Sequence, residues 1–206
     1  MKTVGIIGSG TVAKSLAKGF LEIGYSVMMG TRDIRKLNDL ESVQKGTVAE
    51  SCEFSNLLVL AVKGSVAIEV LKGIDISGKT IIDTTNPIAD SAAINGVIQF
   101  FTAANHSLGQ LLQTAYPTAN FVKAFNSVGS RLMFQPKLGE IKPSMFICGN
   151  STEAKALVAE IVDQFGWEVE DMGQIESSGA IESLCVLWCI RGFKDNKWEH
   201  AFKLLK

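Results

Sequence analysis

A glycine-containing turn near the N-terminus restricts the fold more than any other feature of the sequence. Residues 3–8 are an apolar run that predicts a buried strand, and the string GSGTVA at residues 8–13 follows from its end. Ala13, Leu16 and Phe20 then recur on one stripe of a predicted helix. The order of strand, G-x-G-x-x-A turn and helix is typical of the βαβ unit that binds a dinucleotide.

Each position of this turn has a defined role in such a unit. Gly8 makes the tight turn, Gly10 lets a pyrophosphate approach the backbone, and Ala13 keeps the helix close to the sheet. The amides that open the helix then point at the phosphates, where unpaired donors and the helix dipole both favour an anion. A glycine-rich turn without a ligand is the alternative, and the flanking strand and helix argue against it. The expected phosphate-binding residues are Gly8, Ser9, Gly10, Thr11 and Val12.

The end of the second predicted strand indicates which dinucleotide is bound. In sites that select NAD, an acidic residue stands ~20 residues after the fingerprint and holds the ribose hydroxyls. This chain has Gly30 there, followed by Thr31 and Arg32. A hydroxyl and a guanidinium bind a 2′-phosphate that a carboxylate would repel, and Lys36 can add charge. We therefore expect NADP(H), the alternative being a solvated helix start in which Asp33 pairs locally.

The rest of the chain continues the alternation of apolar runs and helical segments, which favours a mainly parallel sheet. From about Ser177 onward the pattern changes to an apolar helix, with a final helix expected over residues 198–205. The expected fold is a Rossmann-type, doubly wound α/β domain over residues 1–176, with a short C-terminal helical appendage over residues 177–206. Further strands are expected near residues 26–30, 57–62, 80–83, 120–125, 144–148 and 167–171, and a weak one near 46–48.

Two loops that follow predicted strands should lie over the ribose and nicotinamide half of the cofactor. Val62 and Lys63 end one strand, and Asn86 with Pro87 follows the next. Lys63 is either simply exposed or a phosphate or ribose contact. Asn86 and Pro87 either form the floor of the pocket or make a plain turn.

Composition excludes several classes of function. The net charge is −1 and the Lys and Arg residues are scattered, so no nucleic-acid partner is expected. The N-terminus carries no secretory leader and the apolar stretch at residues 184–190 is too short to span a bilayer, so we expect a cytoplasmic chain without a membrane anchor. Four cysteines and two histidines, His106 and His200, form no recognisable disulfide framework or metal site, and we expect structural roles for them.

Four motifs taken in order resemble the coenzyme F-420-dependent NADP oxidoreductase family. They are the glycine turn, residues 30–32 (GTR), residues 83–87 (DTTNP) and residues 122–126 (VKAFN). The likeness covers roughly residues 2–172, and the related dinucleotide-binding domains of six-transmembrane metalloreductases share it. The resemblance implies that Ser9, Gly10, Thr11 and Val12 bind pyrophosphate, that Thr31, Arg32 and Lys36 bind the 2′-phosphate, that Val62 and Lys63 lie at the ribose, and that Ala124 borders the nicotinamide.

The residues that follow the predicted sheet restrict the type of reaction that the protein can catalyse. Its last thirty or so residues offer no His, Lys and carboxylate set that could act as an acid–base relay. Hydride transfer between two stacked rings needs no such relay, so a flavin or deazaflavin acceptor is favoured, and Asn86, Pro87 and Asn126 are candidates for its pocket. Archaeal deazaflavin-using members have a histidine where Asn126 stands, which leaves the acceptor open. The alternatives are a non-catalytic NADP(H) sensor and a small-molecule carbonyl or imine reductase completed across a dimer.

The apolar helix near the C-terminus also suggests a homodimer. Ile181, Leu184, Leu187 and Trp188 leave it apolar around most of its circumference, so packing one side on the sheet would leave another exposed. The alternative is that residues 198–205 fold back and cover the second side within one chain.

Overall fold

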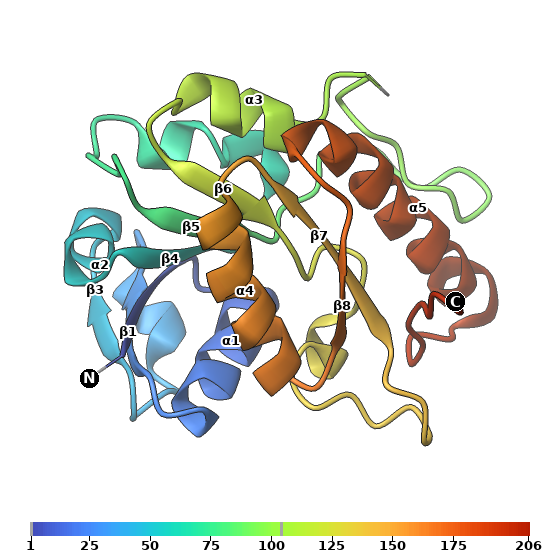
Figure 1. The fold of residues 1–206 in the computed structure, drawn as a ribbon, viewed down its shortest axis with the longest axis horizontal. Helices are drawn as coiled ribbons and strands as arrows, with labels where there is room; N and C mark the ends of the chain where they lie inside the picture. The colour runs from blue at the N-terminus through green and yellow to red at the C-terminus, as the bar shows by residue number, and fades with distance from the viewer. Residues whose placement is uncertain (1, 104) are drawn as a thin grey trace.

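The computed structural model describes residues 2–103 and 105–206, in which strands and helices alternate (Figure 1). The strands are β1 Thr3–Ile7, β2 Ser26–Gly30, β3 Gln44–Gly46, β4 Leu57–Leu60, β5 Thr80–Asp83, β6 Asn120–Lys123, β7 Ser144–Gly149 and β8 Glu168–Asp171. The α-helices are α1 Thr11–Glu22, α2 Val48–Phe54, α3 Leu108–Ala115, α4 Thr152–Gln164 and α5 Ser178–Asp195. Single turns of 3-10 helix are η1 Ile34–Leu37, η2 Gly64–Val66, η3 Glu69–Leu71, η4 Ser130–Leu132 and η5 Ile175–Ser177.

The strands form one sheet in the order β3-β2-β1-β4-β5-β6-β7-β8. All neighbouring pairs are parallel except β6 and β7. The chain winds outward from β1 in one direction to β3 and then returns to add β4 on the other side. This reversal between β1 and β4 is the position at which open α/β sheets bind ligands beyond the carboxyl ends of their strands. The Rossmann-type, doubly wound fold expected from the sequence is confirmed.

Helices cover both faces of the sheet, and each face has its own apolar core. On one face α1 and α4 pack together, with Phe20 and Phe165 in edge-to-face contact at 5.1 Å between ring centroids (Figure 1). On the other face α2, α3 and the first turns of α5 pack against the sheet around Leu60, Leu112 and Ile181. Burying an apolar side chain of this size stabilises a fold by about 1.5–3 kcal/mol. These two cores fix the strand ends that form the site.

The weak strand expected near residues 46–48 is shifted in the structure. β3 ends at Gly46, and Val48 is already the first residue of α2. Thr47 caps this helix: its hydroxyl accepts a hydrogen bond from the Glu50 amide, and the Glu50 carboxylate accepts one from the Thr47 amide. This capping box stabilises the helix start and therefore ends the strand.

The final helix expected over residues 198–205 is wrong, because this tail forms neither a helix nor a strand. α5 ends at Asp195, and the following Asn196 adopts a left-handed conformation with φ 52°. The tail then runs back to the start of β7, where the Ser144 amide donates to the Phe202 carbonyl at 2.9 Å. Lys203 and Lys206 form ion pairs with carboxylates of β8. A short isolated helix is marginal in water, so pairing along the sheet is favoured instead.

Within the part of the chain that the structure describes, no helix has both the length and the apolar character needed to cross a membrane.

Candidate dinucleotide site

The glycine turn after β1 has the conformation that the fingerprint predicts. Gly8 has φ +131°, and a Cβ there would lie 2.2 Å from the Ala61 carbonyl oxygen, so only glycine fits. At Gly10, by contrast, an added Cβ would meet nothing within 4 Å. The first glycine is therefore required by the neighbouring strand, whereas the second leaves open space above the start of α1, as a bound pyrophosphate requires.

The N-terminus of α1 offers unpaired hydrogen-bond donors at this open space. Its N-cap is Gly10, which has no side chain to cap the helix, and the first turn contains no acidic residue. The first amides of an α-helix have no partner within the helix, and the helix dipole makes this end favourable for negative charge. Thr11 is exposed, and Ser9 and Val12 are half-buried, so this cradle is open to a ligand.

The end of β2 lies beside the cradle and is followed by an exposed arginine. Gly8 donates its amide to the Gly30 carbonyl at 2.9 Å, and the hydroxyl of Thr31 donates to that of Ser9 at 3.1 Å. Thr31 therefore lies at the cradle itself, and the exposed Arg32 follows it. Arg32 forms no ion pair with any residue in the ranges 2–103 and 105–206.

The neighbouring arginine, Arg35, already forms an ion pair with Asp33. Arg35 donates from Nε to Asp33 at 2.8 Å, and this hydrogen bond holds the pKa of Asp33 below its ordinary value. The local pairing of Asp33 that the sequence left open is thus real, but its partner is Arg35. Lys36 is exposed in the turn η1 and pairs with no carboxylate in the described residues. Arg32 and Lys36 therefore remain available to a 2′-phosphate.

The loops after β4 and β5 pack closely against each other. A Cβ on Gly64 would lie 2.0 Å from the carbonyl oxygen of Asn86, so the two backbones touch. Val62 is half-buried. Lys63 is exposed and lies 3.6 Å from Asp90, with both side chains about four-fifths exposed at 80% and 81%. Such a pair is weak in water, so Lys63 is free to move toward a ligand.

An asparagine pair joins the loops after β5 and β6. Asn86 donates from Nδ2 to the Asn126 carbonyl at 2.8 Å, and Asn126 donates from Nδ2 to Asn86 Oδ1 at 3.0 Å and to the Ile181 carbonyl at 3.0 Å. Asn126 is only 4% exposed, and its Oδ1 is a buried acceptor without a partner in the described residues. An unpaired buried acceptor is costly in a folded protein, and such groups are enriched at functional sites.

The backbone before Asn126 is strained. Phe125 is fully buried and has φ +60°, a conformation that is unfavourable for a bulky residue. Its amide donates to the sulfur of Met145. The preceding Ala124 is fully buried, and Pro87 is also buried, so both lie beneath the surface of the loops after β5 and β6. The side-chain amide of Asn126 is a polar group held between these loops.

A buried charge cluster that the sequence did not reveal lies under these loops. Lys123 Nζ lies 2.6 Å from Asp83 Oδ2 and 2.9 Å from Glu182 Oε1, and it donates to the Thr85 carbonyl at 2.9 Å. Burial alone lowers the pKa of Lys123, but the two carboxylates outweigh it and hold that pKa above its ordinary value. Glu182 also accepts the amides of Leu108 and Gly109 at the start of α3.

This cluster joins β5, β6, α3 and α5 at one point and so fixes the loops that carry Asn86 and Asn126. Asp83 and Lys123 are paired in register as the last residues of neighbouring parallel strands. Two opposite charges at the ends of buried strands are the signal that could have indicated the pair. Glu182 had no comparable signal, because it lies on a distant helix.

The remaining expectations concern cysteine and histidine. In residues 2–103 and 105–206 all four cysteines are free, and no cluster of three or more His, Cys, Asp or Glu side chains could hold a metal ion. His106 is exposed near the start of α3. His200 stacks on Trp188 with 5.0 Å between ring centroids.

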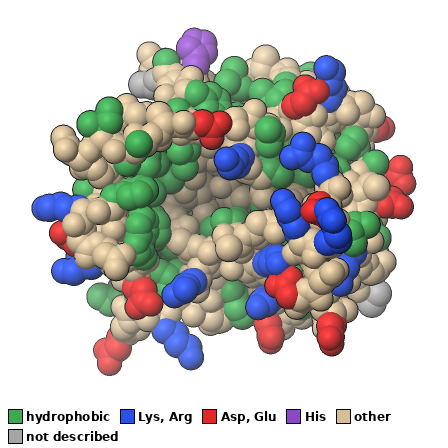
Figure 2. All heavy atoms as spheres, turned by 180° about the vertical axis from the view of Figure 1, so that it is seen from behind, with side chains coloured by type: hydrophobic (Ala, Val, Ile, Leu, Met, Phe, Trp, Pro, Cys, Tyr) green, Lys and Arg blue, Asp and Glu red, His purple; other side chains and the backbone are tan. Residues whose placement is uncertain are grey.

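The face opposite to that of Figure 1 is hollowed at its centre (Figure 2). Lys and Arg side chains gather on the side of this hollow toward β2 and β3, and hydrophobic side chains line the other side. The floor is largely backbone and neutral polar atoms. This distribution is suited to a dinucleotide, which has a phosphorylated end and a flat ring at the other end.

Comparison of the sequence with known proteins supports the nucleotide assignment. The family model "NADP oxidoreductase coenzyme F420-dependent" matches residues 3–87, which include the phosphate cradle, Arg32, Lys36 and Asn86. Metalloreductase STEAP3 of Rattus norvegicus is 29% identical over 185 residues, covering 88% of this chain and 36% of the relative. Metalloreductase STEAP2 of Homo sapiens is 27% identical over 187 residues, with 88% and 35% covered. The chain therefore spans about a third of the length of these curated relatives.

Solved structures show the same fold. A provisionally named F420-dependent NADP-reductase from Arthrobacter sp. FB24 superposes with a TM-score of 0.91 at 26% identity, and all of both chains is covered. A reductive aminase from Aspergillus terreus, in complex with NADPH, gives a TM-score of 0.69 at 19% identity over 95% of this chain and 63% of that one, which shows the fold alone. The resemblance drawn from the motifs is thus confirmed as a similarity: residues 3–87 match the coenzyme F420-dependent NADP oxidoreductase model, and the whole chain shares the fold of the Arthrobacter protein.

Proposed function

We propose that this protein is an NADP(H)-dependent oxidoreductase that transfers a hydride between NADP(H) and a flavin or deazaflavin acceptor. The observation that carries the proposal is a nucleotide cradle with open space at Gly10 and an unpaired guanidinium at Arg32. The loops after β5 and β6, where the nicotinamide ring would bind, form the ring end of the site, and they carry the amides of Asn86 and Asn126 instead of titratable groups.

The residues of the cradle fit NADP(H). The open volume at Gly10 and the uncapped start of α1 suit the pyrophosphate. Thr31, Arg32 and Lys36 follow β2, and such folds bind the 2′-phosphate of the adenosine ribose after this strand. We expect Val62, Lys63 and the backbone of the following loop, after β4, to contact the other ribose.

The ring end of the site favours a planar acceptor over a carbonyl or imine substrate. Reduction of a carbonyl requires a group that gives a proton to the developing alkoxide. The titratable groups under this end are Asp83, Lys123 and Glu182, which are at most 1% exposed and bound to one another. They are sealed from a ligand, so they position the loops and do not exchange protons with a substrate.

What this chain contributes is therefore orientation. When bound, NADPH supplies a hydride to the acceptor ring, which also takes up a proton from solvent. The Asn86–Asn126 pair holds the two loops together and fixes the backbone at the end of the site where the nicotinamide would bind. Holding two rings in contact by such fixed groups supplies most of what direct hydride transfer needs.

The proposal is tested by following anaerobic oxidation of NADPH with flavins and a deazaflavin as acceptors, alongside a panel of ketones and imines. We expect turnover with a ring acceptor and much slower turnover with NADH. Tight NADPH binding without turnover of any acceptor would indicate a redox sensor. Turnover with ketones or imines alone would indicate a small-molecule reductase.

We also propose that the protein forms a homodimer through α5. Trp198 covers one side of this helix, because a Cβ on Gly192 would lie 2.1 Å from its ring. The expected cover within one chain is thus only partial: Leu187 and Phe193 remain 55% and 53% exposed. The loop around Gly96 lies beside Phe193, because a Cβ added to Gly96 would lie 3.5 Å from the Phe193 Cβ, and this loop also carries the exposed Ile94. Monomers seldom leave large apolar surfaces uncovered, so these exposed side chains on and beside α5 support an interface there.

A further inference from the structure

The buried cluster of Asp83, Lys123 and Glu182 contains more negative than positive charge. It lies where the ends of β5 and β6 meet the starts of α3 and α5, two helices that contact each other (Figure 1). Among residues 2–103 and 105–206 the other buried charged side chain is Glu170 on β8, which is paired with Lys206. Two carboxylates and one ammonium therefore leave one negative charge that no other buried cation of the described residues cancels.

The hydrogen bonds of the cluster require both carboxylates to be ionised. Asp83 Oδ1 accepts from the Thr85 amide at 2.9 Å and from the Thr85 hydroxyl at 2.6 Å, while its Oδ2 faces Lys123. Glu182 accepts from the first two amides of α3, at 3.1 and 2.9 Å, and also faces Lys123. A protonated carboxyl group would need an acceptor for its own O–H. Every partner of these oxygens in the described residues is a donor, which only the carboxylate form satisfies.

Lys123 supplies the positive charge of the cluster. The two carboxylates hold its pKa above the ordinary value, so the side chain is an ammonium, and its charge cancels that of one carboxylate. The start of α3 adds about half a positive charge beside Glu182. Glu182 itself lies in the second turn of α5, beyond the first turn, in which the charge at the end of that helix is felt. The cluster as a whole therefore remains negative.

This negative charge lies directly under the ring end of the site. Lys123 Nζ donates at 2.9 Å to the backbone carbonyl of the residue before Asn86. The side-chain amide of Asn126 donates at 3.0 Å to the backbone carbonyl of the residue before Glu182. The cluster is at most 1% exposed, so protein and not water separates it from the ring end. A charge acts much more strongly across protein than across water or salt solution.

We infer that the net negative charge of Asp83, Lys123 and Glu182 stabilises the oxidised nicotinamide relative to the reduced one, and so favours hydride donation by NADPH. The nicotinamide ring is positively charged in NADP+ and neutral in NADPH. When its C4–H bond breaks, the hydrogen leaves with both electrons for the acceptor ring, which also takes a proton from solvent, and the nicotinamide becomes positive. The inference rests on the proposed function for the place of this ring, but it makes a separate claim about binding.

The test compares the dissociation constants of NADP+ and NADPH, measured separately by calorimetry without any acceptor. The two nucleotides share their phosphates and riboses, so the ratio of the constants reports the charge of the ring. One unit charge ~10 Å away, at an effective dielectric constant of about 20, changes a binding equilibrium roughly tenfold. Glu182→Gln should therefore shift the ratio about tenfold toward NADPH. Asp83→Asn, which removes the same charge at another point, should shift it in the same direction by a similar factor.

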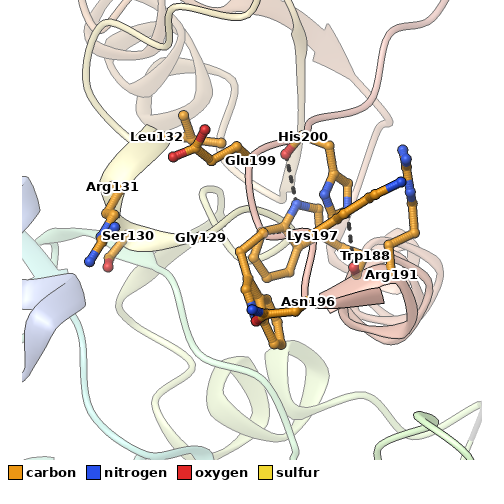
Figure 3. A pocket seen from close by; sticks show the side chains of 11 residues that line it. Gly129, Ser130, Arg131, Leu132, Trp188, Arg191, Asn196, Lys197, Glu199 and His200 are labelled. Carbon is orange, nitrogen blue, oxygen red and sulfur yellow. Dashed lines mark hydrogen bonds between the residues drawn. The ribbon is translucent and has the colours of Figure 1, made fainter. Parts of the chain in front are cut away.

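Two further variants separate the effect of charge from that of structure. Glu182→Asp shortens the side chain but keeps its charge, so it should retain the ratio of the unaltered protein even if both nucleotides bind more weakly. Glu199→Gln is the matched control for loss of a carboxylate. It removes an exposed one at the cavity between η4 and the chain that follows α5 (Figure 3), and should leave the ratio unchanged.

An unchanged ratio in Glu182→Gln and Asp83→Asn, or an equal shift in Glu182→Asp, would overturn the inference. Circular dichroism identifies a variant that does not fold, and the other neutralising variant then decides. Failure of the proposed function would look different, because the ratio would respond to the charge but no ring acceptor would be reduced. Conversely, reduction of a ring acceptor with a ratio that is indifferent to these variants would support hydride transfer and exclude a role for the buried charge.

Discussion

Replacing Arg32 with alanine should remove most of the preference for NADPH over NADH. Arg32 is exposed next to Thr31, whose hydroxyl reaches the cradle residue Ser9 at 3.1 Å, and no carboxylate of the described residues neutralises it. Its guanidinium can therefore bind a 2′-phosphate without first breaking an ion pair. Loss of one charge-assisted contact costs about 1.5–3 kcal/mol, which corresponds to roughly one to two decades in dissociation constant.

The assay is a titration of each protein with NADPH and with NADH, followed by nicotinamide fluorescence or calorimetry. Arg32→Ala should weaken NADPH by about ten- to a hundredfold and leave NADH nearly unchanged. Arg35→Ala should have a smaller effect, because this side chain is already bound to Asp33. Lys18→Ala, which removes an exposed charge from α1, is the control for net charge. Equal affinity of the unaltered protein for both nucleotides, or equal losses in Arg32→Ala and Lys18→Ala, would refute this reasoning.

Four further results are expected. Gly10→Val should abolish nucleotide binding, because the valine side chain would occupy the open space that the pyrophosphate needs, and circular dichroism should stay unchanged because no protein atom is displaced. Gly8→Ala should instead reduce folding, because Gly8 has φ +131° and the Ala61 carbonyl blocks the added Cβ. Lys123→Met should lower the free energy of unfolding by about 3–5 kcal/mol, since two buried carboxylates lose their counter-ion, and thermal or urea unfolding measures this. The folded-state pKa of Lys123 is raised above 10.5, so the stability that its charge provides is present at neutral pH and is lost as the pH rises through that raised pKa. In urea unfolding, the free energies of unfolding of the unaltered protein and of Lys123→Met should therefore converge at high pH. A difference that stays constant with pH would contradict this. In sedimentation at micromolar concentration the protein should run as a dimer that Leu187→Glu dissociates and the exposed-loop control Ile141→Glu does not; a monomeric unaltered protein would exclude the α5 interface.

The elements that the sequence predicted well are those whose signal is local. Buried parallel strands are short apolar runs bounded by turns, so β2 and β5 were predicted with the bounds that the structure shows. The phosphate turn was equally clear, because its glycines have roles set by backbone conformation and by the neighbouring strand.

The features that the sequence did not predict depend on tertiary contacts. Residues 198–205 have an apolar pattern compatible with a helix, but in the structure this segment is not helical and contacts the start of β7 and the carboxylates of β8. The charge cluster requires the register of β5 against β6 together with a helix that follows much later in the chain. The cavity between η4 and the C-terminal tail is lined by residues 129–132, 188, 191 and 196–200, which only the folded chain brings together.

Hydride transfer from NADPH to a ring acceptor is tested most directly by following the hydrogen itself. NADPH deuterated at the transferred position is incubated anaerobically with the protein and a deazaflavin, whose reduced ring carbon does not exchange its hydrogen with water. We expect mass spectrometry to find deuterium in the reduced deazaflavin in step with NADP+ formed, and to find much less with the Gly10→Val protein. Formation of NADP+ without deuterium in the acceptor, or no reduction of any ring acceptor while NADPH binds tightly, would contradict the proposed function.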